Sequence, residues 1–222
     1  MTMQENIRDI VVFGAGGFGR EVACIIKRIN KIKPTWRFIG FFDDNASLIG
    51  TTNDYGTILG TSDDLAAWDK PLAVVIGIGS PKAVYSIANK IIRNTHLTYP
   101  NIIDPTVCVN DEDNYTLGQG NVIAANCFIS IATKVGDFNT INNNTALGHD
   151  AVVGSYNSFM PSVNISGGVT IGDRNFFGVK STILQYLKVG NDTTIGANAL
   201  VTKDTEDGLL YIGIPAKAKS RH

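Results

Sequence analysis

The strongest constraint on the fold is an apolar residue that recurs at every sixth position between Leu117 and Val201. All fifteen of these positions are aliphatic or Phe, and the next residue is Gly at eight of them. Two residues before the apolar position the side chain is mostly small, as at Thr133 and Ala151. A period of six fits neither the 3.6-residue turn of a helix nor the two-residue alternation of a strand. It is the period of a parallel β-helix, in which every sixth side chain points into a narrow core.

Fifteen hexapeptides, at three per triangular turn, predict about five coils of this helix. Gly and Asn suit the corners between strands because both tolerate positive φ, and this accounts for the asparagines at 142–144. Residues 105–116, which include a polar run at 110–114, are interpreted as the first coil together with a turn or linker. The period lapses after Val201, as expected of a terminal cap.

The first part of the chain has a different pattern. An apolar run at 9–13 leads into a G-x-G-x-x-G sequence at 14–19, and residues 20–30 carry one apolar helical face. Strand, glycine loop and helix in this order are the context in which the motif binds nucleotides. Its glycines let the backbone approach a ligand, and the helix N-terminus offers N–H groups to phosphate. The alternative is a glycine turn that only lets the helix pack closely on the strand.

A second predicted strand, 36–42, ends at Asp43 and Asp44. An acidic residue at this place commonly binds a ribose hydroxyl in dinucleotide folds, although both carboxylates could also be solvated turn residues. The domain has about 100 residues, which is too few for a two-halved dinucleotide fold, so a plain NAD-dependent dehydrogenase is disfavoured. The remaining predicted elements are a strand, a helix and an extended segment, at 72–76, 81–93 and 97–103.

We therefore predict a small Rossmann-like β-α-β domain over residues 1–104, followed by an all-β parallel β-helix over 105–222. The formal net charge of −1 gives no electrostatic reason to expect nucleic acid or an anionic membrane as partner. The three cysteines lie in apolar or repeat contexts, which favours free thiols in a reducing compartment over disulfides or a metal site. No apolar segment approaches the roughly 20 residues of a membrane span, and no secretory signal is visible, so we predict a cytoplasmic protein.

One histidine stands out among the three in the chain, His96, His149 and His222. His149 alone lies inside the regular repeat, just after a predicted corner, and Asp150 follows it. Imidazole is a base near neutral pH, so His149 could take the proton of an acceptor amine or hydroxyl as that group attacks a thioester. Asp150 could orient the ring, provided that the corner brings together two residues that would point apart in a strand. The alternative is an ordinary surface histidine.

Six segments carry a resemblance to a known family, at 12–22, 42–44, 100–105, 148–150, 195–197 and 213–217. Together they resemble the bacterial sugar acetyltransferases, which include sialic-acid O-acetyltransferases and nucleotide-4-amino-sugar N-acetyltransferases. The similarity covers about residues 9–219. The repeat alone would indicate only the broad acyltransferase superfamily, and the joined α/β domain makes the resemblance specific.

The resemblance implies a left-handed β-helix, a homotrimer, acetyl-CoA as the donor, no metal, and an active site between neighbouring prisms. It implies His149 as the general base and an oxyanion-binding N–H near Gly167. Lys203 and Lys217 would lie near the phosphorylated end of CoA, or else belong to a solvated tail. The residues implied for the nucleotide sugar are Gly14, Gly16, Gly17, Asp43 and Asp44, and those implied for CoA are Gly178, Ala197, Lys203 and Lys217.

The sequence departs from the family at two positions. Phe18 stands where members often carry His, and Ser158 stands where some amino-sugar enzymes carry a second His. Because the α/β domain suits a nucleotide, the sequence predicts transfer of acetyl from acetyl-CoA to the amino group of a nucleotide-activated amino sugar. Two alternatives remain open: O-acetylation of a sugar such as sialic acid, and a non-catalytic trimeric scaffold that binds nucleotide sugars.

Overall fold

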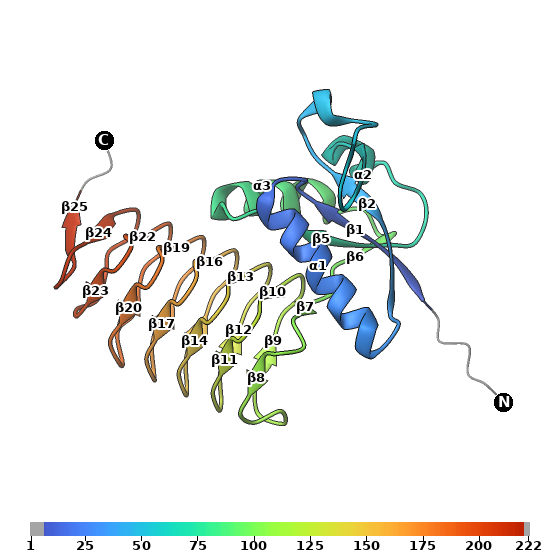
Figure 1. The fold of residues 1–222 in the computed structure, drawn as a ribbon. Helices are drawn as coiled ribbons and strands as arrows, with labels where there is room; N and C mark the ends of the chain where they lie inside the picture. Colours follow the sequence, from blue (N-terminus) through green and yellow to red (C-terminus); the bar gives the residue numbers. More distant parts are fainter. Residues whose placement is uncertain (1–6, 220–222) are drawn as a thin grey trace.

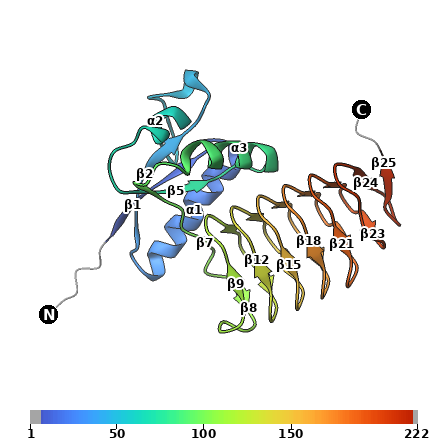
Figure 2. The same cartoon turned by 180° about the vertical axis from the view of Figure 1, so that it is seen from behind.

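A computed structural model describes residues 7–219, so His222 lies outside the described residues. A small α/β domain packs against the N-terminal end of a long prism of short strands (Figure 1; Figure 2 shows the opposite side). Among residues 7–219, no helix has both the length and the apolar character that crossing a membrane requires.

The α/β domain contains one six-stranded sheet with the order β3-β4-β2-β1-β5-β6. Its central strands are apolar because helices cover both sheet faces, and every residue of β5 is buried. Only β3 runs antiparallel to its neighbour. The strands are β1 (Arg8–Phe13), β2 (Trp36–Phe42), β3 (Thr52–Asn53), β4 (Gly56–Gly60), β5 (Leu72–Ile76) and β6 (Leu97–Thr98). The helices are α1 (Gly17–Ile32), the 3₁₀ helix η1 (Ala46–Leu48), α2 (Ser62–Ala66) and α3 (Pro81–Ile91).

The predicted strands at 36–42 and 72–76 agree with β2 and β5. The extended segment predicted at 97–103 is wrong as a single element, because it divides between two sheets. β6 closes the edge of the α/β sheet, whereas β7 (Ile102–Ile103) pairs with the prism strand β10 (Val122–Ile123). The position of the domain boundary at 104 and 105 stays a prediction, and β7 lies just before it.

The prism has three faces, on which each strand pairs in parallel with the strand of the next coil, and only the last strand of face 1, β25, pairs antiparallel with its neighbour β24. Face 1 contains β7, β10, β13 (Thr140–Ile141), β16 (Ser158–Phe159), β19 (Phe176–Phe177), β22 (Thr194–Ile195), β24 (Leu210–Ile212) and β25 (Lys217–Lys219). Face 2 contains β8 (Cys108–Val109), β11 (Phe128–Ile129), β14 (Ala146–Leu147), β17 (Asn164–Ile165), β20 (Thr182–Ile183) and β23 (Leu200–Val201). Face 3 contains β9 (Thr116–Leu117), β12 (Lys134–Val135), β15 (Val152–Val153), β18 (Thr170–Ile171) and β21 (Lys188–Val189).

The predicted apolar ladder forms the core of the prism. In every strand from β9 to β23 the second residue is the ladder residue, and these side chains pack in one continuous cluster. Phe159 and Phe177 show the packing between coils, because their rings are stacked with centroids 4.6 Å apart. The ladder is therefore a structural scaffold, since its apolar side chains pack against one another.

The structure corrects the reason for the glycines of the repeat, which was predicted to be their tolerance of positive φ. Every sixth residue from Gly120 to Asn198 has positive φ, between 53° and 69°, and this residue lies three positions after the ladder residue. The glycines directly after the ladder residues are needed for a different reason. At Gly136, for example, a Cβ would lie 2.8 Å from the carbonyl oxygen of Gly154 in the next coil. Close stacking of the coils, rather than positive φ, therefore requires glycine at those positions.

The α/β domain is fixed to face 1 and to the corner between faces 3 and 1, which we call corner 3–1. Ile102, Val122 and Ala124 of face 1 pack in one apolar cluster with β1 and α1. At the corner, the ring of Phe138 lies 5.3 Å from Tyr99 and the ring of Tyr156 lies 5.1 Å from Tyr85 of α3, as centroid distances. The domain thus covers one side of the prism and leaves the opposite corner open.

Candidate active site

His149 lies on that open side, in the turn between β14 and β15 that joins faces 2 and 3. We call this edge of the prism corner 2–3. The His149 side chain is 51% exposed and that of Asp150 is 65% exposed. Nδ1 of His149 lies 2.8 Å from Oδ2 of Asp150, which is hydrogen-bond distance.

The backbone explains why two adjacent side chains meet. Asp150 is the positive-φ residue of its turn, with φ 58°, so its side chain is not directed away from His149 as it would be in a strand. A hydrogen bond from Nδ1–H to the carboxylate leaves the lone pair of the imidazole on Nε2. The corner thus brings the Asp150 carboxylate to the His149 ring, which was the condition for its predicted role in orienting the imidazole.

Gly167 lies beside the imidazole, one coil further along the prism. A Cβ at Gly167 would overlap with the imidazole ring at Nε2, so this position accepts only a residue without a side chain while His149 keeps its place. Within residues 7–219, the N–H of Gly167 donates to no protein acceptor. A Cβ at Gly148 would lie 2.6 Å from that nitrogen, so the glycine at 148 keeps the N–H uncovered. A base and an unpaired amide donor therefore lie side by side on an exposed corner.

A second concave site lies in the α/β domain, and we call it the glycine-loop pocket. It has a volume of about 560 Å³ and lies at the carboxyl ends of β1, β2 and β5, where open α/β sheets bind their ligands. All five residues implied for the nucleotide sugar line this pocket: Gly14, Gly16, Gly17, Asp43 and Asp44. The structure thus brings this predicted set together.

Packing explains only some of the glycines in the loop. Gly14 has φ +104°, and a Cβ there would lie 2.8 Å from the carbonyl oxygen of Gly77. A Cβ at Gly19 would overlap with the carbonyl oxygen of Gly14. By contrast, a Cβ at Gly16 or Gly17 would meet no described atom within 4 Å. These two glycines border open space at the N-terminus of α1, where backbone N–H groups can bind phosphate.

The two carboxylates already have structural partners. Oδ2 of Asp43 accepts a hydrogen bond of 2.9 Å from the N–H of Ala15, which ties the glycine loop to the end of β2. Oδ1 of Asp44 accepts one of 2.8 Å from the N–H of Ser62 at the start of α2. Oδ1 of Asp43 also accepts a hydrogen bond of 2.9 Å from the N–H of Asn45, so both side chains hold the pocket in shape.

Sequence reasoning missed one wall of this pocket. Gly77, Ile78 and Gly79 follow β5 and line the pocket opposite the first glycine loop. A Cβ at Gly77 would lie 2.8 Å from the Cα of Gly19, so the two loops are in contact. The signal was present in the sequence as a second Gly-x-Gly after an apolar strand.

One chain does not bring the two halves of the site together. The glycine-loop pocket belongs to the domain that covers face 1, whereas His149 lies on corner 2–3, the edge opposite that face. The residues implied for CoA are also spread over the prism. Gly178 and Ala197 follow face 1 strands, and the exposed residues Lys203 and Lys217 lie at its C-terminal end.

Comparison with known proteins agrees with this architecture. Residues 9–91 match the PglD N-terminal domain family. The α/β domain is thus similar to the PglD N-terminal domain. A serine acetyltransferase of Mycobacterium tuberculosis is 33% identical over 106 residues, which is 44% of this chain. That match covers 42% of the relative, so the chain spans less than half of the length of this curated protein.

Several solved structures match nearly the whole chain. The acetyltransferase domain of PglB from Neisseria gonorrhoeae is 24% identical with a TM-score of 0.87, and the match covers 96% of this chain and 100% of that one. PerB from Caulobacter crescentus, solved in complex with CoA and GDP-perosamine, is 25% identical with a TM-score of 0.84, over 96% of this chain and 98% of that one. The predicted fold class, a Rossmann-like domain followed by a left-handed β-helix, and the resemblance to sugar acetyltransferases are confirmed.

Proposed function

We propose that this protein transfers the acetyl group of acetyl-CoA to the amino group of a nucleotide-activated amino sugar. The observation that carries the proposal is the arrangement at corner 2–3, where the His149–Asp150 pair lies against the unpaired N–H of Gly167. Proton transfer and stabilisation of an oxyanion are the two requirements of acyl transfer from a thioester. The likeness to PerB, which was solved with CoA and a nucleotide sugar, supports the choice of substrates.

In the proposed reaction, the nitrogen of the amino sugar attacks the thioester carbonyl carbon while Nε2 of His149 accepts the proton that the amine loses. The carbonyl oxygen becomes an oxyanion, and the N–H of Gly167 stabilises it. Collapse of this tetrahedral intermediate breaks the carbon–sulfur bond. The departing CoA thiolate then takes the proton back from Nε2, so the imidazole returns to its neutral form. Asp150 holds Nδ1 and stabilises the imidazolium between the two transfers.

The proposed site contains parts of two chains. Because the glycine-loop pocket and His149 lie on opposite sides of one prism, a nucleotide sugar bound to one chain is expected to meet His149 of a neighbour. Gly178, Ala197, Lys203 and Lys217 would then bind CoA in the groove between the two prisms. A homotrimer with three such grooves satisfies this geometry, because closed rotational symmetry repeats one interface. Sedimentation of the protein, whose chain mass is 23.8 kDa, tests the number of chains.

The activity test uses the full chain, acetyl-CoA and 4-amino sugars linked to UDP, GDP or dTDP, with release of the CoA thiol as the readout. We expect thiol release that depends on one of the amino sugars. Turnover on a free sugar hydroxyl and on no amine would replace the proposal with O-acetylation. Tight binding of nucleotide sugars without thiol release from any acceptor would indicate a non-catalytic scaffold.

A further inference from the structure

A second cleft opens on face 1 just beyond the coils that the α/β domain covers. It has a volume of about 710 Å³ and lies between the start of α3 and the prism, so we call it the α3–prism cleft. One wall comes from Ser80, Lys82 and Tyr85, and the other from Arg174, Phe176 and Asp192. Its volume falls in the range of small-molecule sites, and none of the residues predicted from the sequence lies in it.

This cleft adjoins the glycine-loop pocket. Gly79 lines both cavities, and it is the point where they meet. A Cβ at Gly79 would have only the Met160 methyl group nearby, at 3.9 Å, so the passage is bordered by the flexible end of a side chain. A ligand whose nucleotide lies on the glycine loop and which extends past Gly79 therefore enters the α3–prism cleft.

The prism wall of the cleft contains an aromatic ring that packs in none of the apolar clusters of the described chain. On face 1 the outward-facing residues of β10, β13 and β16 are at most 2% exposed, because the α/β domain covers them. Phe176 occupies the same position on β19, the next strand, but it belongs to none of the apolar clusters among residues 7–219. A partly exposed ring in the wall of a cleft offers a flat apolar surface on which the C–H face of a pyranose can stack.

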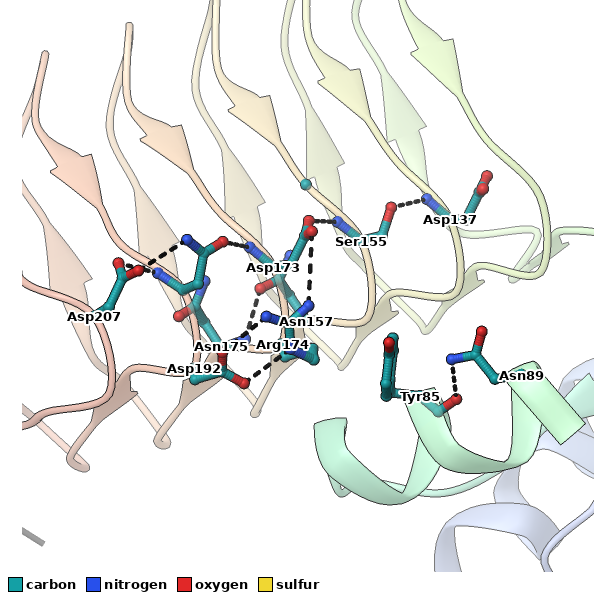
Figure 3. A network of polar contacts seen from close by, with 12 residues as sticks. Tyr85, Asn89, Asp137, Ser155, Asn157, Asp173, Arg174, Asn175, Asp192 and Asp207 are labelled. Atoms are coloured by element: carbon teal, nitrogen blue, oxygen red, sulfur yellow. Dashed lines mark hydrogen bonds and ion pairs between the residues drawn. The ribbon is translucent and has the colours of Figure 1, made fainter.

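The prism side of the cleft is a rigid polar pair. Nε and Nη2 of Arg174 donate to the two carboxylate oxygens of Asp192 at 2.9 and 2.8 Å (Figure 3). The guanidinium carbon also lies 5.3 Å from the ring centroid of Tyr85 on α3. Such a bidentate pair holds the remaining N–H donors of Arg174 in fixed positions. These are the groups that hydrogen-bond the hydroxyls and amines of sugars.

We propose that the α3–prism cleft is the subsite for the pyranose ring of the nucleotide sugar, with Phe176 as its stacking surface and the Arg174–Asp192 pair as its polar wall. The inference rests on the proposed function in one respect, that the substrate is a nucleoside-diphosphate sugar. The pantetheine arm of CoA is the competing occupant, and the experiment below distinguishes it.

The test compares, by calorimetry on the full chain, the affinity for UDP, GDP or dTDP with the affinity for the 4-amino sugar linked to the same nucleotide. The ratio of the two dissociation constants is the sugar increment. We expect Phe176→Ala to lower the sugar increment about tenfold and to leave the affinity for the nucleoside diphosphate unchanged, because only the sugar contacts the ring. Phe176→Tyr, which keeps the ring, should restore the increment.

Ile92→Ala is the matched control, since Ile92 is 39% exposed and lies at the other end of α3, away from the cleft. It should change neither affinity. An unchanged sugar increment in Phe176→Ala would overturn the assignment, and so would an equal loss for nucleoside diphosphate and nucleotide sugar. A raised KM for acetyl-CoA with an unchanged increment would place the donor in the cleft instead. The binding comparison needs no turnover, so a protein that binds the amino sugar through Phe176 but releases no thiol would overturn the proposed function alone.

Discussion

Two corners of the prism have the same backbone and opposite chemistry. At corner 3–1, the side chain of one coil accepts a hydrogen bond from the backbone N–H of the coil before it. Ser155 accepts from Asp137 at 3.0 Å and Asp173 accepts from Ser155 at 2.7 Å, and Asn191 and Asp207 continue the series (Figure 3). At corner 2–3, the position equivalent to Ser155 is Gly167, which has no side chain to accept from the N–H of His149, and among residues 7–219 no side chain accepts from the N–H of Gly167 either. The proposed active site thus lies at the corner that lacks this capping series.

The two corners also differ in the residue with positive φ. Corner 2–3 has Ala132, Asp150, Gly168 and Tyr186 there, and its one aromatic residue, Tyr186, is 73% exposed. Corner 3–1 has Phe138 and Tyr156, for which this backbone costs about 1–2 kcal/mol each. Both aromatic rings pack on the α/β domain, and burial of large rings offsets that cost. One repeat therefore forms both corner 3–1, where the α/β domain packs, and corner 2–3, where the proposed active site lies, and the two corners differ only in their side chains.

Among changes at corner 2–3, replacing His149 by Ala should lower kcat the most. We expect kcat to fall by roughly 10²–10⁴, because the acceptor then has no positioned base. His96→Ala is the matched control, since His96 is exposed in the α/β domain and should leave kcat unchanged. Thiol release under saturating substrates measures both variants, and an unaltered rate in His149→Ala would remove the proposed mechanism.

Replacing Gly167 by Ala should have the next largest effect. The new methyl group would overlap with the imidazole and displace it, so we expect kcat to fall by about 10². Ser155→Ala is the reciprocal change at corner 3–1, where it removes one cap from the N–H of Asp137. It should lower the melting temperature slightly and leave kcat unchanged. Equal activity of Gly167→Ala and wild type would show that the imidazole does not work from its observed position.

The sequence predicted the prism well because its core depends on one rule, an apolar side chain at every sixth residue. It also placed Gly14, Gly16 and Gly17 in one pocket, since a glycine loop between strand and helix is local information. It could not place His149 relative to that pocket, because their separation depends on which face the α/β domain covers. The α3–prism cleft was beyond prediction for the same reason: Tyr85 and Arg174 are distant in sequence and meet only after the domain has docked.

The interior of corner 3–1 provides a prediction about stability. Asn121, Asn139, Asn157 and Asn175 form a buried ladder in which each side-chain oxygen accepts from the N–H of the next, as from Asn157 to Asn139 at 2.9 Å. Asn157→Ala removes the acceptor for the N–H of Asn175 and should destabilise the fold by about 2–4 kcal/mol. Asn164→Ala, at an exposed position of the same prism, should cost less than about 0.5 kcal/mol. Urea unfolding measures both, and equal losses would mean that the ladder adds nothing specific.

The smallest expected effect concerns the third corner, between faces 1 and 2. Burial raises the pKa of the Cys127 thiol there to about 11, and its S–H donates to the carbonyl oxygen of Asn142 at 3.1 Å. Cys24 and Cys108 are exposed, so a thiol reagent at pH 8 should modify two cysteines per chain quickly and the third only after unfolding.

The same thiol should make stability depend on pH in the alkaline range. An ordinary cysteine has a pKa of 9.0, so between about pH 9 and 11 the unfolded chain loses the Cys127 proton while the folded chain keeps it. The unfolded state then binds fewer protons, and the free energy of unfolding falls as the pH rises. Tyr99, whose pKa burial raises to about 12, acts in the same direction at higher pH. Cys127→Ala removes the first contribution only, so melting temperatures of the two proteins should converge as the pH rises from 9 to 11. Parallel curves would show that the fold does not raise the pKa of Cys127.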